Sequence, residues 1–208
     1  RLCGLEVPQG HWRSAANHFL RAQADDQGRS LRLQLGSYRD QLREQAGEKV
    51  TQSGGQKTPT RGFAYQDPNR PPYGSMTTAG IAGLVICKAG LLGTSQQKAD
   101  VLPKIDDAIR AGFAWLAAEF TVRDNPGRFG VRSNWYYYLY GIERAAELAG
   151  LARLQGRDWY YEGALQLLHQ QQRNGSFRSE VANTQAIDST CFALLFLKKA
   201  TLPAVTTK

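Results

Sequence analysis

The sequence is poor in cysteine and has no cluster of potential metal ligands. Its three cysteines, Cys3, Cys87 and Cys191, lie far apart, and no Cys-X-X-Cys pair occurs. A disulfide framework requires paired cysteines, and a structural zinc site requires closely spaced thiol and imidazole ligands. We therefore expect neither, and no cofactor. Cys87 and Cys191 fall within apolar segments, where a free cysteine packs as a small hydrophobic residue.

Long hydrophobic runs are absent as well. A membrane-spanning helix needs about 20 consecutive apolar residues. The nearest run, 77–87, is shorter and rich in glycine and alanine, which predicts a closely packed helix rather than a membrane span. The sequence also lacks a phosphate-binding glycine loop, a dinucleotide-binding fingerprint and a Ser-His-Asp arrangement. It therefore gives no sign of those enzyme classes.

The composition is that of an ordinary globular domain. Of 208 residues, 42% are hydrophobic and 21% are charged. A net charge of +8 raises the question of a polyanionic partner. Residues 29–61 hold seven basic and three acidic side chains and so supply +4, half of that charge. A solvated basic loop accounts for this, so nucleic acid is not a favoured partner. The sequence starts at Arg1, which is compatible with the removal of a leader and with export of the protein. The sequence does not determine the cellular compartment.

A unit of two helices repeats along the chain, with a period of about 60 residues. Its clearest copy has an aromatic helix at 133–149 and a second helix at 158–171. Apolar inner helices, buried on all sides, alternate with amphipathic outer ones. The inner helices are expected at 75–89, 133–149 and 188–200, with Ser75, Ser133 and Asp188 as N-caps. Helix stops are expected at Gly4, Gly90 and Gly150, because glycine adopts positive φ at little cost.

A basic polar insertion, 27–61, interrupts the first unit of a single repeat domain that spans 1–208. We expect a short helix at 37–46 and a mobile linker at 52–59 within it. The first unit lacks the body of its inner helix. We therefore expect the chain to be a piece of a longer one.

Several segments resemble the terpenoid cyclase and protein prenyltransferase superfamily. Residues 163–177, with Gln171 and then Gly175-Ser176-Phe177, resemble its QW motif, with Phe177 in place of the usual tryptophan. Gln23 and the segment 62–65 resemble a second copy that the insertion splits. Three further segments are similar to prenyltransferase/squalene-oxidase repeat proteins of planctomycete-type bacteria: 74–80, 134–140 and 191–197.

The resemblance implies an all-α fold, an α/α toroid built from helical hairpins. The helices counted here make up three pairs, roughly half of a six-pair ring. Missing sequence or a second subunit would then close the ring.

The resemblance also points to Asp188 as a candidate catalytic acid. Squalene-type cyclases protonate an alkene with the middle aspartate of a DxDD motif. Asp188 aligns with that position, whereas Ala186 and Ser189 occupy the other two aspartate positions. The acid requires burial and charged neighbours to work in this way. The alternative, which we favour, is that Asp188 caps its helix.

Aromatic side chains would line the cavity of such an enzyme and stabilise a carbocation. Consecutive helical residues point in different directions, so at most two of residues 135–138 can face one cavity. The candidates are Tyr73, Trp135, Tyr136, Tyr137, Tyr138, Tyr140 and Phe192.

Two other chemistries are weaker. A prenyltransferase needs an Asp, Cys and His set for zinc; Asp188 and Cys191 lie within one helical turn, but His169 belongs to an outer helix. Aspartates beside helices could serve an α/α-barrel glycosidase, although such residues more often form turns or caps. They are Asp67, Asp124 and Asp158.

Because the acids and metal ligands of the resembled fold are incomplete, we expect a non-catalytic repeat domain. It would present a concave surface to a protein, peptide or glycan. The alternative is an isoprenoid cyclase or transferase that uses Asp188 and binds an isoprenoid ligand. A glycan-processing barrel is the third reading.

Overall fold

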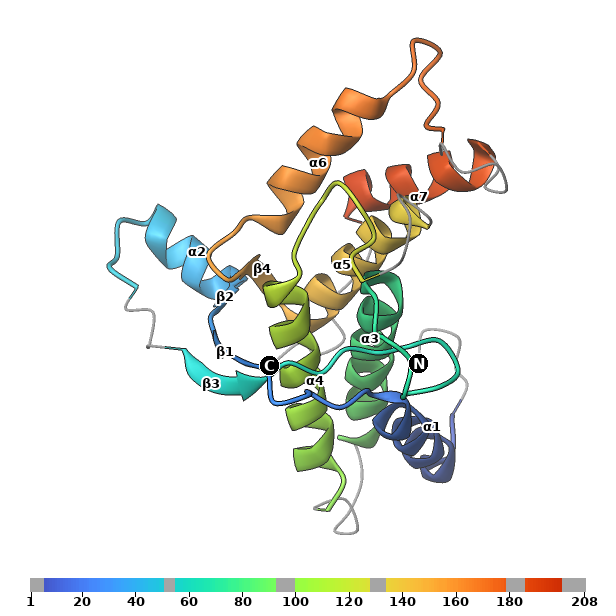
Figure 1. Ribbon diagram of the computed structural model, residues 1–208. Helices are drawn as coiled ribbons and strands as arrows, with labels where there is room; N and C mark the ends of the chain where they lie inside the picture. Colours follow the sequence, from blue (N-terminus) through green and yellow to red (C-terminus); the bar gives the residue numbers. More distant parts are fainter. Residues whose placement is uncertain (1–5, 51–54, 93–99, 128–133, 179–185, 200–208) are drawn as a thin grey trace.

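The computed structural model describes residues 6–50, 55–92, 100–127, 134–178 and 186–199 (Figure 1). Of these residues, 57% are helical and 11% are in strands. The helices are α1 (Gln9–Ala22), α2 (Tyr38–Gln45), α3 (Gly74–Leu91), α4 (Leu102–Ala118), α5 (Trp135–Ala149), α6 (Trp159–Gln170) and α7 (Ala186–Lys198). The strands are β1 (Ser30–Leu33), β2 (Leu35–Ser37), β3 (Gln56–Pro59) and β4 (Leu151–Leu154). The protein is therefore predominantly helical, as expected, and the described residues also form two small sheets that were not expected.

Helices α3, α5 and α7 lie side by side and form what we call the central row (Figure 1). Helices α1 and α4 pack on α3, and α6 packs on α5 and α7. The segments expected as inner helices thus make up the row, and those expected as outer helices flank it. The hydrophobic core follows the row, with one cluster around α5 and a second between α1, α3 and α4.

Helix α3 is enclosed by its neighbours α1, α4 and α5. This helix of 18 residues is long enough and apolar enough to cross a membrane, by length and composition alone. However, 61% of that window is buried inside the protein. The apolar character of α3 is explained by its position in the core, where its neighbours cover most of its surface.

Glycine allows the closest helix contacts in the row. A Cβ on Gly141 of α5 would lie 2.2 Å from Thr78 Oγ1 of α3, so no larger residue fits this crossing. Gly90, predicted as a helix stop, lies inside α3, and a Cβ there would lie 2.4 Å from the Trp12 ring. Helix α3 ends at Leu91, so the predicted helix end is correct to within about two residues, but Gly90 has no positive φ and instead makes room for a tryptophan of α1. Gly150 does end α5, with a φ of 69°.

Two expected N-caps are also wrong. Helix α3 begins at Gly74, so Ser75 lies in its first turn, where its N–H donates to Asn125 Oδ1 (2.8 Å) and its hydroxyl accepts from Asn125 Nδ2 (3.0 Å). Helix α7 begins at Ala186, so Asp188 lies in its first turn instead of capping it. Asp158 does cap α6, by accepting from the Tyr161 N–H at 2.9 Å. Ser133 and Gly4 lie outside the described residues.

The insertion has more regular structure than expected. The short helix predicted at 37–46 is confirmed as α2, which begins with a reciprocal capping box between Ser37 and Asp40. Residues 56–59, predicted as linker, instead form β3 and pair with β1. Strand β2 pairs with β4, about a hundred residues further along the chain, and ties the insertion to the end of α5.

The two ends of the insertion meet in space. The Ala24 N–H donates to the Gly62 carbonyl at 2.9 Å, and Gln23 forms a β-bridge with Phe63. The Gln23 side chain donates to the carbonyls of Arg61 (3.0 Å) and Ala108 (2.8 Å). The insertion therefore leaves and re-enters the helical part at one place.

Phe63 and Phe177 occupy matching positions. The Phe63 N–H donates to Thr77 Oγ1 near the start of α3, and the Phe177 N–H donates to Thr190 Oγ1 near the start of α7, both at 3.0 Å. Both rings are buried. Phe177 follows the flanking helix α6, and Phe63 pairs with Gln23 at the end of the flanking helix α1, across the insertion; each docks on the next helix of the central row. This shared arrangement supports an internal repeat.

Candidate functional site

An open groove of about 340 Å³ runs between α3 and α5 on one face of the central row. Small and aliphatic residues of α3 form one wall, among them Ala79, Ala82 and Ile86. Tyr137, Tyr140 and Arg144 of α5 form the other. These three residues are spaced three, four and seven apart, which places them on one side of a helix.

Phe192 of α7 continues the aromatic wall of the groove. Its ring centroid lies 5.3 Å from that of Tyr137 and 5.5 Å from that of Tyr140. Arg144 donates to the Tyr140 hydroxyl at 3.0 Å, and its guanidinium carbon lies 5.7 Å from the centroid of the same ring. The groove thus combines apolar small residues, tyrosine rings and one guanidinium group. Such a surface can accept an apolar side chain next to a negatively charged group.

The other aromatic candidates lie in the core. Trp135, Tyr136 and Tyr138 are buried. Trp135 donates to the Val122 carbonyl at 2.9 Å, and Tyr136 donates to the Arg178 carbonyl at 3.1 Å. Burial raises the pKa of the Tyr138 hydroxyl. Of the four consecutive residues 135–138, only Tyr137 lines the groove. Tyr73 is the N-cap residue of α3 and is partly buried.

Asp188 is exposed on the first turn of α7. It lies one helical turn before Phe192, so both residues share a side of α7. Because Asp188 is exposed, its carboxyl group faces solvent and is not enclosed in a cavity. A carboxylate in the first turn instead complements the helix dipole.

The remaining candidate aspartates have structural roles or are exposed. Asp67 accepts from the N–H and side-chain amide of Asn69, both at 3.0 Å, in a local turn. Asp158 caps α6, and Asp124 is exposed. Within the described ranges, no three His, Cys, Asp or Glu side chains come close enough to hold a metal ion. Cys87 is buried, as expected, but Cys191 is exposed, and Cys3 lies outside the described residues.

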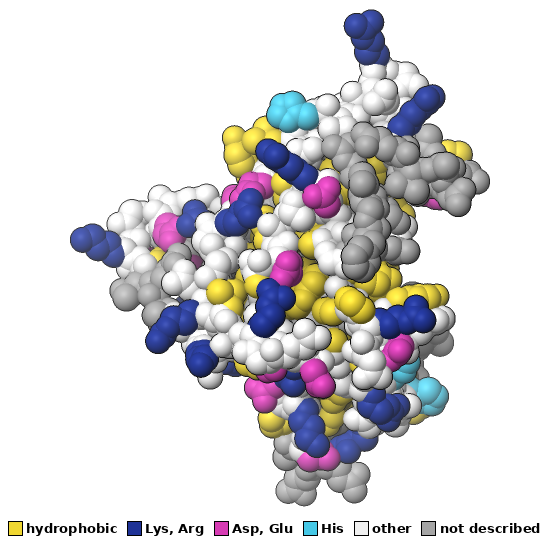
Figure 2. All heavy atoms as spheres, in the orientation of Figure 1, with side chains coloured by type: hydrophobic (Ala, Val, Ile, Leu, Met, Phe, Trp, Pro, Cys, Tyr) yellow, Lys and Arg dark blue, Asp and Glu magenta, His cyan; other side chains and the backbone are white. Residues whose placement is uncertain are grey.

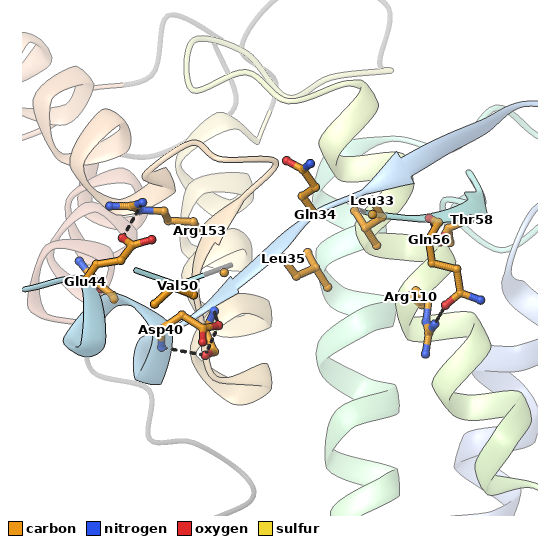
Figure 3. A pocket seen from close by; sticks show the side chains of 14 residues that line it. Leu33, Gln34, Leu35, Asp40, Glu44, Val50, Gln56, Thr58, Arg110 and Arg153 are labelled. Atoms are coloured by element: carbon orange, nitrogen blue, oxygen red, sulfur yellow. Dashed lines mark hydrogen bonds and ion pairs between the residues drawn. The ribbon is translucent and has the colours of Figure 1, made fainter. Parts of the chain in front are cut away.

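A second hollow, of about 480 Å³, lies between the insertion, α4 and β4 (Figure 3). Its charged side chains form ion pairs and hydrogen bonds with other residues of the hollow. Glu44 pairs with Arg153 at 3.0 Å, and Arg110 donates to Gln56. Asp40 accepts from Ser37, and these hydrogen bonds hold the pKa of its carboxyl below the usual value. The hollow therefore presents few groups ready to bind a charged ligand.

The surface charges are mixed. Figure 2 shows Lys and Arg side chains spread over the visible face, with Asp and Glu side chains between them. Several basic residues of or near the insertion are paired: Arg29 with Glu119, and Arg43 with Glu48 at 2.7 Å. The excess positive charge does not form one continuous patch on this face.

Comparisons with known proteins give no match. No protein-family model matches the chain. No curated protein and no solved structure matches it either. The relation to prenyltransferase/squalene-oxidase repeats therefore stays a prediction from the residues.

Sequence reasoning did not single out Arg144. Its distance of four and seven residues from Tyr140 and Tyr137 is the signal that could have identified it. The hollow beneath the insertion was also not predicted, because it depends on the pairing of β2 with β4.

Proposed function

We propose that this chain is a non-catalytic binding domain of the α/α-toroid type, which takes up a peptide segment in the groove between α3 and α5. The observation that carries the proposal is the groove itself. It is open and lined by tyrosines, aliphatic residues and Arg144, whereas the candidate acid Asp188 is exposed.

Two features support the toroid part of the proposal. First, Phe63 and Phe177 dock in the same manner on α3 and α7, as expected of repeated helical hairpins. Second, apolar side chains are uncovered at the α7 end of the row, where Ile187 is 70% exposed and Leu194 is 55% exposed. A repeat array buries such side chains against its next unit, which further sequence or a second subunit would supply.

The lining of the groove favours a peptide over a glycan. Sugar sites combine an aromatic platform with many polar side chains, whereas the described residues that line this groove offer only the tyrosine hydroxyls, Thr78 and Arg144 as polar side chains. An aliphatic peptide side chain would pack on Ala82 and Ile86. A carboxylate of the peptide would pair with Arg144.

Binding to peptide and glycan arrays tests this proposal. The informative variant is Tyr137→Ala, because Tyr137 is 37% exposed and its loss should leave the fold intact. The matched control is Tyr161→Ala on α6, where the side chain is 61% exposed and distant from the groove in sequence. We expect Tyr137→Ala to weaken peptide binding by about tenfold or more. If Tyr137→Ala does not change the affinity for the bound peptides, the groove is not the peptide-binding site. If the protein binds only glycans, the glycan-binding hypothesis replaces this proposal.

An isoprenoid cyclase or transferase is the second candidate, favoured by the position of Asp188 one turn from Phe192 and its two tyrosine neighbours. It predicts that an isoprenoid co-purifies with the protein, or that squalene or a prenyl diphosphate is converted. Extraction with mass spectrometry and an incubation assay would detect either. Loss of the signal in Asp188→Asn would establish this candidate, and its persistence would remove Asp188 from the chemistry.

A further inference from the structure

The side chain of Lys199 lies in a box of aromatic rings. Its Nζ is 4.6 Å from the ring centroid of Tyr160, 4.8 Å from that of Tyr38 and 5.4 Å from that of Trp159. Glu147 Oε1 completes the enclosure at 3.2 Å from Nζ. We call these four residues, Tyr38, Glu147, Trp159 and Tyr160, the cage. They come from α2, α5 and α6, and Lys199 follows the last residue of α7.

Each ring of the cage is held by contacts that do not involve Lys199. Trp159 donates to the Leu151 carbonyl at 3.0 Å, and Tyr160 donates to the Leu197 carbonyl at 2.7 Å. The Tyr160 ring also stacks on Phe196, with centroids 5.5 Å apart. The Tyr38 hydroxyl donates to Glu147. The cage would therefore keep its shape without the lysine, as a preorganised binding site must.

The surroundings of the cage favour a positive charge. The Glu147 side chain is only 10% exposed, so its interaction with a cation is screened little by water. Burial and the bond to Glu147 raise the pKa of the Tyr38 hydroxyl, which therefore stays protonated. Helices α5 and α7 both end close to the cage, and helix C-termini attract cations.

Lys199 occupies the cage at a conformational cost. Its φ is +48°, in the left-handed region that non-glycine residues rarely adopt. Gly150 has the equivalent position after α5, with φ +69°. Glycine is the usual residue there. The protein instead has a lysine, Lys199, after α7. The Lys199 side chain is 31% exposed, so the cage is open to solvent.

We propose that the cage is a binding site for a trimethylammonium group, and that Lys199 is its internal occupant, which the ligand displaces. Three aromatic faces and a carboxylate around one point make up the arrangement that recognises methylated ammonium ions. Such a cation is more weakly hydrated than the lysine ammonium, so transfer into the cage costs it less. This site is separate from the groove between α3 and α5, and the proposal does not depend on the function of that groove.

Replacement of Lys199 tests the proposal. The variant Lys199→Ala empties the cage, and Lys198→Ala, at the neighbouring exposed lysine, is the matched control. Tetramethylammonium chloride is titrated into each purified protein, with binding followed by calorimetry and by the NMR signal of the Trp159 indole N–H. Choline and a peptide with Nε-trimethyl-lysine identify which source of the group is preferred. The same peptide with unmethylated lysine controls for charge alone.

We expect Lys199→Ala to bind tetramethylammonium at least about tenfold more tightly than the unchanged protein, as for a cage that Lys199 fills about nine tenths of the time. Lys198→Ala should behave like the unchanged protein. Glu147→Gln, added to Lys199→Ala, should weaken binding. If Lys199→Ala does not fold, Lys199→Gln keeps the length of the side chain and removes its charge. The proposal is overturned if a folded Lys199 variant binds no methylated cation, or binds the unmethylated peptide equally well.

Discussion

Replacement of Thr77 by valine tests the contact that repeats between Phe63 and Phe177. Valine has nearly the shape of threonine, but its methyl group cannot accept a hydrogen bond. The Thr77 side chain is fully buried, and its Oγ1 lies 3.0 Å from the backbone nitrogen of Phe63. Thr77→Val therefore removes the acceptor of a buried N–H while the volume of the core stays the same.

The expected cost is the penalty for an unmatched buried donor, about 1–3 kcal/mol. For a domain of this size, each kcal/mol lowers the melting temperature by roughly 2–4 °C. Thr77→Ser is the matched control, because it keeps the acceptor and removes one buried methyl group, at a cost of about 0.8 kcal/mol. Only the valine variant should release the Phe63 segment from α3.

Urea unfolding gives the change in the free energy of unfolding, and amide hydrogen exchange reports on the Phe63 N–H directly. We expect faster exchange at Phe63 in Thr77→Val and little change in Thr77→Ser. Thr190→Val should produce the same pattern at Phe177, with a smaller cost because Thr190 is only partly buried. The reasoning is refuted if Thr77→Val is as stable as the unchanged protein and its Phe63 amide stays protected.

Three further predictions follow from the packing and the ionisable groups. Gly141→Ala should destabilise the protein by about 1–3 kcal/mol, since the new Cβ would lie 2.2 Å from Thr78 Oγ1. Gly10→Ala, where a Cβ meets nothing within 4 Å, should stabilise α1 by about 0.5–1 kcal/mol, and equal melting temperatures for the two variants would contradict this packing. In a Cys3→Ser background, a thiol reagent should label the exposed Cys191 quickly in the native protein. Cys87 should react only after unfolding, because it is buried and burial raises the pKa of its thiol. Equal labelling of the two cysteines in the native protein would disprove this. The Asp40 carboxyl has a folded-state pKa below its ordinary 3.8, because it accepts hydrogen bonds from Ser37, so its stabilisation of α2 is present above that pH and is lost as the pH falls further. Asp40→Asn should remove this acid dependence, measured as amide exchange in α2 between about pH 2 and pH 5, and an unchanged dependence would assign it to another group.

Local signals in the sequence were sufficient for several elements. Asp158 before an aromatic and leucine-rich run correctly marked the start of α6, because a capping side chain bonds to backbone groups only three residues away. Gly150 marked the end of α5 for the same reason, and the short helix expected at 37–46 is α2. The row of apolar helices could also be predicted, since a helix without a polar side must be enclosed.

Signals that depend on a distant partner were misread. Gly90 was interpreted as the residue that ends α3 through a positive φ, but the helix continues to Leu91 and Trp12 packs against this glycine. Residues 56–59 have the composition of a linker, but β1 pairs with them. The aromatic run 135–138 gave no indication of which ring would face the groove, because that depends on where α3 and α7 pack against α5.

The sequence by itself determined where most of the helices lie and several of their ends, because these depend on hydrogen bonds and residue preferences over a few positions. The tertiary structure alone decided which surfaces are available for binding. It exposed Asp188, opened the groove beside Tyr137, and brought Tyr38 together with Glu147 and Lys199, which both lie more than a hundred residues further along the chain. Such contacts arise only when packed helices bring remote side chains together, and no local pattern encodes their geometry.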